Sequence, residues 1–141
     1  MTNKKRIEQI VFLCDYGMVR SKTMCQAAVH GDHKYDFTFR DALYVAGVLN
    51  HTVEQQRYNL SKVDKVVICN KPSFDTKFKD KNYPEDQKEA LWKLFMEEFK
   101  DKVIICDALG EDVWQQAGHP DLYKICVEWI DKNGDKILEG T

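Results

Sequence analysis

The chain has 141 residues, of which 43% are hydrophobic and 31% charged, an ordinary balance for a globular domain that buries its own core. Its 21 basic and 23 acidic residues leave a net charge of −2, which argues against a nucleic-acid partner because phosphate contacts need a basic surplus. No apolar run approaches the roughly 20 residues of a membrane span, and residues 10–13 are too few for a signal-peptide core. We therefore expect a cytoplasmic protein with no membrane partner.

Four short apolar runs alternate with segments of helical character and predict the order of elements along the chain. We expect strands at residues 10–13, around 37–45, at 66–69 and at 103–106. We expect helices at residues 21–29, 52–60, 85–99 and 122–130. Thr52 is the predicted N-cap of the second helix, and Pro120 and Asp121 suit the first turn of the last one.

This alternation predicts an α/β fold in a single domain over residues 1–141. A four-stranded parallel sheet with helices on both faces would form a three-layer sandwich, its strands covered on both sides. Leu91, Leu94, Phe95 and Phe99 form an apolar stripe that predicts core residues in the third helix. The last helix places Leu122, Ile125, Cys126, Trp129 and Ile130 on one apolar stripe. Residues 70–101, a long loop followed by a helix, form an insertion, and we expect its charged part at residues 70–88 to shape substrate choice or a partner surface.

The five cysteines stand at positions 14, 25, 69, 106 and 126. Their odd number and the lack of a Cys-x-x-Cys pair argue against a disulfide framework and against a zinc ribbon. Cys69, Cys106 and Cys126 lie within apolar stretches, where a free cysteine behaves as a small buried hydrophobe. Cys14 differs because it stands where the first strand ends, and parallel α/β sheets bind ligands beyond the carboxyl ends of their strands.

Cys14 opens a Cys-x5-Arg-Ser pattern that ends with Arg20 and Ser21 at the start of a predicted helix. Five intervening residues allow successive backbone N–H groups to point at one oxyanion, which also meets the positive end of the helix. Arg20 can place two hydrogen bonds on phosphate oxygens. The same positive environment favours a low pKa for Cys14, and Ser21 is placed to donate a hydrogen bond to the thiolate. The pattern predicts a thiolate nucleophile that acts on phosphate esters.

The predicted phosphate-binding loop consists of Asp15, Tyr16, Gly17, Met18, Val19 and Arg20. Gly17 lies in the middle of the loop, where a tight anion-binding turn often needs positive φ. Asp15 is less favourable, because a carboxylate next to the cysteine repels phosphate unless it points outward.

The segment resembles the signature loop of the low-molecular-weight protein tyrosine phosphatases, and more closely that of small predicted bacterial and phage-type members. Softer similarities lie at Ala46-Gly47 after the second strand and at residues 63–67 before the third. The resemblance implies a phosphotyrosine phosphatase I-like fold and a cysteine-dependent phosphatase that hydrolyses phosphotyrosine or another aryl phosphate through a phosphocysteine. It implies no metal and no cofactor, and a phosphorylated protein or a small phosphate ester as partner.

In that family a general acid comes from the loop after the last strand, with an aromatic residue two positions later. Asp112 and Trp114 match this arrangement, although Val113 stands where the family usually has proline. Asp107 is the alternative general acid, and Glu111 comes third. The resemblance also makes Tyr16 and Trp114 candidates for the walls of the substrate pocket.

The same pattern is compatible with other functions. The loop could bind a phosphorylated partner without turnover, or Cys14 could be purely structural. Relatives of the fold reduce arsenate through two further cysteines near the third strand, where the sequence has only Cys69. Cys25 is a candidate redox partner of the nucleophile. Residues 30–33, with two histidines and an aspartate, predict a surface turn rather than a metal site. The oligomeric state is not predicted.

Overall fold

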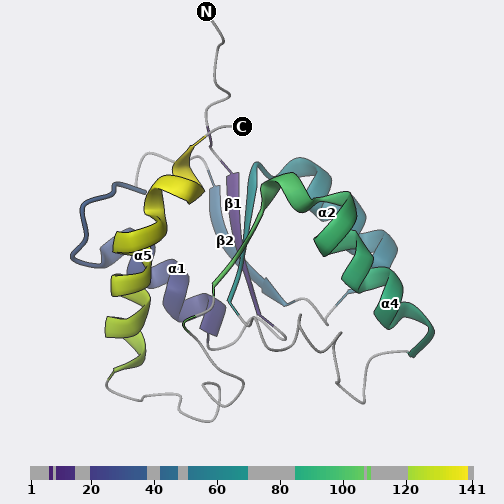
Figure 1. The fold of residues 1–141 in the computed structure, drawn as a ribbon, viewed down its shortest axis with the longest axis horizontal. Coiled ribbons are helices and arrows are strands. Elements are labelled where there is room, and N and C mark those ends of the chain that lie inside the picture. Colours follow the sequence, from purple (N-terminus) through teal and green to yellow (C-terminus); the bar gives the residue numbers. More distant parts are fainter. Residues whose placement is uncertain are drawn as a thin grey trace, which may run out of the picture.

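A four-stranded parallel sheet lies at the centre of the molecule, as the prediction of an α/β fold required (Figure 1). The structure is a computed structural model that describes residues 7, 9–14, 20–37, 42–47, 51–69, 85–106, 108 and 121–139. Its strands are β1 (Gln9–Cys14), β2 (Ala42–Gly47), β3 (Lys65–Ile68) and β4 (Val103–Ile105). Their order is β2-β1-β3-β4, so successive connections run to opposite sides of β1. The carboxyl end of β1 is therefore a topological switch point, where ligands of such sheets bind.

Helices cover both faces of the sheet and complete a three-layer sandwich. α1 (Arg20–His30) and α5 (Leu122–Leu138) pack together on one face, while α2 (Val53–Lys62) and α4 (Glu85–Lys93) cover the other (Figure 1). A π-helical turn, η2 (Leu94–Glu98), and a 3-10 turn, η3 (Lys100–Lys102), lead from α4 into β4. None of the described helices is both long and apolar enough to cross a bilayer.

Two hydrophobic clusters, one on each face of the sheet, form the core. The α1/α5 face buries alternate residues of β1, among them Ile10, Phe12 and Cys14. The α2/α4 face buries the residues between them, Val11 and Leu13. This alternation follows from the period of two of a strand, which sends successive side chains to opposite faces.

The start of α2 confirms the predicted cap. The Thr52 side chain accepts a hydrogen bond from the Gln55 N–H at 3.2 Å, and the Gln55 side chain accepts one from the Thr52 N–H at 2.9 Å. This reciprocal pair is a capping box, which satisfies two N–H groups that have no partner within the helix.

The second strand differs from its prediction in position and in exposure. β2 spans Ala42–Gly47, so Phe37 lies outside it, although Phe37 is buried in the α1/α5 cluster. Ala46 and Gly47 form the end of this strand rather than following it. Among the described strands β2 is an edge strand that pairs with β1, so it is not covered on all sides, and Tyr44 is 38% exposed.

The last two helices also depart from their predicted bounds. The predicted helix at 85–99 widens at Leu94, where the Phe99 N–H donates to the Leu94 carbonyl at 3.0 Å, five residues back. The last helix runs beyond residue 130 to Leu138, because Ile137 continues its buried stripe. Ile125, predicted on the apolar stripe, lies at its margin: it is about 100° around the helix from buried Cys126 and is 36% exposed. Asp121 is the N-cap residue instead of lying in the first turn.

Candidate active site

Cys14 is the last residue of β1 and lies at the switch point of the sheet. Its strand partner on one side is Gly47 at the end of β2, and Leu13 beside it pairs with Ile68 of β3. The Cys14 side chain is 3% exposed and belongs to the α1/α5 cluster. A thiol in this position is held by a strand with neighbours on both sides, so its backbone has little freedom to move.

Ser21 contacts Cys14 directly. The distance between Cys14 Sγ and Ser21 Oγ is 3.2 Å, and both side chains are buried. The two residues are seven positions apart, so the chain leaves the strand and returns to the same place at the first turn of α1. This contact confirms the predicted juxtaposition of Cys14 and Ser21.

Arg20, the first residue of α1, is 3% exposed despite its charge. The first turn of this helix has no acidic residue and holds a second cation, Lys22, which points to solvent. Cations are disfavoured at a helix N-terminus, where the partial charge is already positive. A buried arginine in this position concentrates positive potential at the carboxyl end of β1, and an anion bound there would offset it.

Cys69 and Cys106 lie in the same lateral row as Cys14, which was not predicted. The Cys69 N–H donates to the Leu13 carbonyl and the Cys106 N–H to the Ile68 carbonyl, each at 2.7 Å. Both thiols are fully buried, as their apolar contexts predicted. A signal was present in the sequence, because three apolar strands end alike, as Phe-Leu-Cys, Val-Ile-Cys and Ile-Ile-Cys.

The pKa values of Cys69 in the row and of Cys126 on α5 depend on burial and on neighbouring ionisable groups. Burial raises the pKa of the Cys69 thiol well above its ordinary value, the nearby Cys106, Cys14 and Cys126 raise it further, and the Arg20 guanidinium lowers it. Burial, with a smaller contribution from Cys106, raises the pKa of Cys126 to about 12. These thiols are therefore protonated at neutral pH. The influence of Arg20 on Cys69 also shows that the arginine charge acts at the end of the sheet.

Gln56 is a buried polar residue beside the site that sequence analysis missed. It is 2% exposed, and its Nε2 donates to the Gly47 carbonyl at 3.2 Å. Gly47 pairs with Cys14, so this bond ties the first turns of α2 to the end of the edge strand next to the cysteine. We assign Gln56 a positioning role for the end of β2.

The remaining predicted site residues lie outside the described residues. In the loop these are Asp15, Tyr16, Gly17, Met18 and Val19, and after β4 they are Asp107, Glu111, Asp112 and Trp114. Their roles in phosphate binding, in acid catalysis and in lining a substrate pocket stay predictions.

His33 has a structural role in the turn after α1. Its Nε2 donates toward the carbonyls of Ala28 and Ala27, at 2.9 and 3.1 Å, and its Nδ1 accepts from the Tyr35 N–H at 3.1 Å. These contacts satisfy carbonyls at the end of the helix. Within the described ranges no group of three or more histidine, cysteine or acidic residues is arranged to hold a metal ion.

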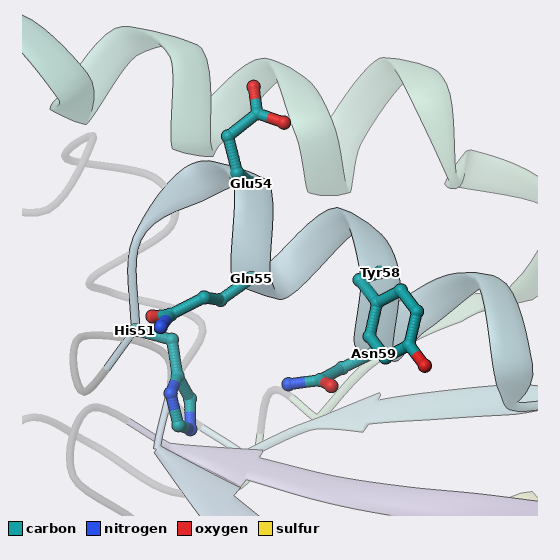
Figure 2. A pocket seen from close by; sticks show the side chains of 5 residues that line it. All are labelled: His51, Glu54, Gln55, Tyr58 and Asn59. Carbon is teal, nitrogen blue, oxygen red and sulfur yellow. The ribbon is translucent and has the colours of Figure 1, made fainter.

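An open cavity of about 420 Å³ lies along α2, away from the cysteine row. Figure 2 shows its lining: the His51 and Gln55 side chains lie close together at the start of the helix, and Tyr58 and Asn59 follow one turn later. Glu54 points to the opposite side of the helix (Figure 2). The cavity is lined by α2 and by His51, two residues before the helix begins, and these residues bring no nucleophile together with a cation.

Comparison of the chain with family models, with curated proteins and with solved structures finds no match.

Proposed function

We propose that the protein is a cysteine-dependent phosphatase that hydrolyses phosphate monoesters, with phosphotyrosine or another aryl phosphate as the substrate class. The observation that carries the proposal is the 3.2 Å contact between Cys14 Sγ and Ser21 Oγ at the switch point of the sheet, next to buried Arg20. A nucleophile, a hydrogen-bond donor to it and a cation for the substrate meet at the positive end of one helix.

The proposed reaction has two steps. The Cys14 thiolate attacks phosphorus and forms an S–P bond, while the ester P–O bond breaks and the leaving oxygen takes a proton from a general acid, for which Asp112 is the candidate. Water then attacks the phosphocysteine, the acid residue accepts its proton, and inorganic phosphate leaves as the thiolate returns. Arg20 stabilises the charge that spreads over the phosphoryl oxygens, and Ser21 donates to the sulfur as it departs.

The two described groups that touch or flank the sulfur support this chemistry more than a structural role for Cys14. A buried structural cysteine needs neither a hydroxyl against its sulfur nor a guanidinium buried at the adjacent helix start. The Arg20 guanidinium can place two hydrogen bonds on a phosphate dianion bound at this end of the sheet.

The direct test is hydrolysis of p-nitrophenyl phosphate by the wild type and by Cys14→Ser, Arg20→Ala and Asp112→Asn. We expect no turnover without the thiol, a loss of about 100- to 1,000-fold in kcat/KM without the guanidinium, and a loss of about 100-fold or more in kcat without the acid. Lys22→Ala is the matched control for Arg20, since it removes an exposed cation from the same helical turn. A wild type and a Cys14→Ser variant with the same rate would contradict the proposal.

A non-catalytic phosphate-binding module is the second candidate, because Asp15 and the lack of an Asp-Pro pair weaken the match to a complete phosphatase site. The same protein separates the two functions. Binding of vanadate or phosphate that depends on Arg20, without hydrolysis of p-nitrophenyl phosphate, would favour the binding module.

A further inference from the structure

The outer edge of β2 is open among the strands that the structure describes. β1 pairs with β2 on one side, and no described strand lies on the other. β2 reads Ala-Leu-Tyr-Val-Ala-Gly, so it has none of the charged residues or prolines that protect exposed edges from pairing. Tyr44 is 38% exposed, and Leu43 and Val45 are half-buried. The edge therefore presents an apolar strand to which another extended segment can add.

The cavity along α2 lies on the flank of the helix that points away from α4. The other flank is marked by Arg57, whose Nε donates to Glu98 of η2 at 3.0 Å. Gln55 and Asn59 are each two residues from Arg57, so they lie about 160° around the helix from it. Figure 2 shows the Gln55 and Asn59 side chains on the side of α2 that is turned toward the strands. The cavity thus opens beside the sheet rather than between the two helices.

Tyr44 connects the open edge with this cavity. It points to the same side of the sheet as α2, because Ala46, two residues later on the strand, packs against the buried cluster of the α2/α4 face. A strand added to β2 would send alternate side chains to that side, where they meet Tyr44 from below and the flank of α2 from beside.

The cavity begins near the candidate active site. His51 lines its near end and follows Gly47 by four residues, and Gly47 is the strand partner of Cys14. The eight residues from His51 to Asn59 rise by about 12 Å along the helix direction, a length that about four residues of an extended peptide span. The strand spacing of about 4.8 Å between Cys14 and Gly47 brings the total to about five residues. A substrate with its phosphate at Cys14 can therefore reach the whole cavity with the residues next to the phosphorylated one.

The lining suits a peptide rather than a second anion. Among the described lining residues there is no lysine or arginine, and Glu54 points to the other side of the helix (Figure 2). The Asn59 amide has both donors and an acceptor, which match the polar groups of a peptide backbone or side chain. Tyr58 is 62% exposed, and tyrosine is one of the residues that protein interfaces favour.

We propose that a phosphoprotein substrate binds with the residues next to its phosphotyrosine extended along β2, as an added strand whose alternate side chains enter the cavity beside α2. This inference rests on the proposed function, because it needs the phosphoryl group of the substrate at Cys14. It narrows the substrate class from any aryl phosphate to a phosphotyrosine within an extended protein segment. Backbone hydrogen bonds to β2 provide affinity, and the cavity selects among side chains.

The first test compares N-acetyl-phosphotyrosine amide with a peptide of eleven residues that has phosphotyrosine at its centre and alanine, serine and valine on both sides. For the wild type we expect kcat/KM to be about tenfold higher for the peptide, through a lower KM. Two further peptides are methylated at alternate backbone nitrogens, one at the odd and one at the even flanking positions. Because alternate residues of an edge strand face its neighbour, one of these two peptides should lose the advantage and the other should keep most of it.

The second test removes side chains from the cavity. The double variant Tyr58→Ala/Asn59→Ala should raise KM for the peptide about fivefold, and both constants for N-acetyl-phosphotyrosine amide should stay within about twofold. The matched control is Lys93→Ala/Glu97→Ala, which changes two exposed residues of the open cavity of about 470 Å³ on the α4 side of α2. The control should match the wild type with both substrates, and urea unfolding checks that both variants are folded.

The outcomes that overturn the inference are distinguishable from failure of the proposed function. A protein that hydrolyses N-acetyl-phosphotyrosine amide through Cys14, but shows no advantage for the peptide, refutes the peptide site alone. An advantage that survives in both methylated peptides or in the double variant refutes it as well. A protein that hydrolyses neither substrate faster than its Cys14→Ser variant refutes the proposed function and this inference together.

Discussion

The two faces of the sheet are alike in burial and different in chemistry. Each is covered by two helices, and each has a cluster of buried residues beneath them. The α1/α5 face has four of the five cysteines in its buried cluster, at positions 14, 69, 106 and 126. The buried cluster of the α2/α4 face consists of valine, leucine, isoleucine and phenylalanine side chains. Burial alone therefore does not identify a site in this fold.

The difference between the faces arises because alternate residues of a strand point to opposite sides of the sheet. Cys14 points to the same face as Phe12 because the two lie two residues apart, while Leu13 between them faces α2. A register or sequence shift of one residue would send the thiol to the α2/α4 face, away from Ser21 and the start of α1. The site thus depends on where each strand ends as much as on the residue that ends it.

The largest expected effect is a loss of stability, and we expect it to be similar on the two faces of the sheet. Phe12 on the α1/α5 face and Phe95 on the α2/α4 face are both fully buried. Phe12→Ala and Phe95→Ala should each lower the free energy of unfolding by about 3–5 kcal/mol, since both remove a large side chain from a packed cluster. Urea unfolding followed by circular dichroism measures the loss. Values that differ by more than about twofold would show that one face carries more of the stability than the other.

The next largest effect is on catalysis, and we expect it on the α1/α5 face but not on the α2/α4 face. Ser21→Ala should lower kcat for p-nitrophenyl phosphate by about 10- to 100-fold, because it removes the hydroxyl 3.2 Å from the Cys14 sulfur. Ser61 on α2 is the matched control: its hydroxyl donates to the Tyr58 carbonyl at 2.7 Å and is exposed. Ser61→Ala should leave kcat unchanged. Equal rates for Ser21→Ala and the wild type would remove the hydroxyl from the mechanism.

The strands and helices on both faces were predictable because the sequence patterns that indicate them are local. Apolar runs identify the strands, and the threonine and glutamine at the start of α2 identify its cap. Cys14, Arg20 and Ser21 were predictable for the same reason, since one short pattern spans a strand end and a helix start. Such patterns need no knowledge of which strands are neighbours.

The cysteine row was not predictable in the same way, because it depends on pairing between distant segments. Cys69 stands alone near the third strand in the sequence, and strand order with parallel register brings it beside Cys14. The edge position of β2 and the exposure of Tyr44 depend on the same non-local order. The π-helical turn after α4 has no local signal such as proline or glycine.

Alkaline pH should weaken the α1/α5 face through its buried thiols. The pKa of Cys126 is about 12 in the folded protein and near the ordinary value of 9.0 when unfolded. Between these values the unfolded chain loses a proton that the folded chain keeps, so stability is full below about pH 9 and falls as pH rises. The slope for one cysteine is at most about 1.4 kcal/mol per pH unit.

Urea unfolding of the wild type and Cys126→Ala at pH 8, 9 and 10 tests this. The variant should be less stable at pH 8 because of the lost packing, but its stability should fall less steeply with pH. Leu91→Ala on the α2/α4 face is the control, since it removes a fully buried side chain without a titrating group. Parallel curves for Cys126→Ala and the wild type would show that this thiol does not contribute to the pH dependence.

The smallest effect concerns the cap of α2, and it tests whether a change on the α2/α4 face leaves kcat unaltered. Thr52→Ala removes the oxygen that accepts from the Gln55 N–H, so the free energy of unfolding should fall by about 1 kcal/mol, while Thr52→Ser should retain most of it. The same helix carries Gln56, whose buried bond to Gly47 lies beside Cys14. Because packing rather than the cap holds Gln56 in place, Thr52→Ala should leave kcat within about twofold of the wild type. A larger fall in kcat for Thr52→Ala, with a normal kcat for Thr52→Ser, would mean that the start of α2 positions the end of β2 for catalysis. The α2/α4 face would then contribute to catalysis, although the nucleophile itself lies on the α1/α5 face.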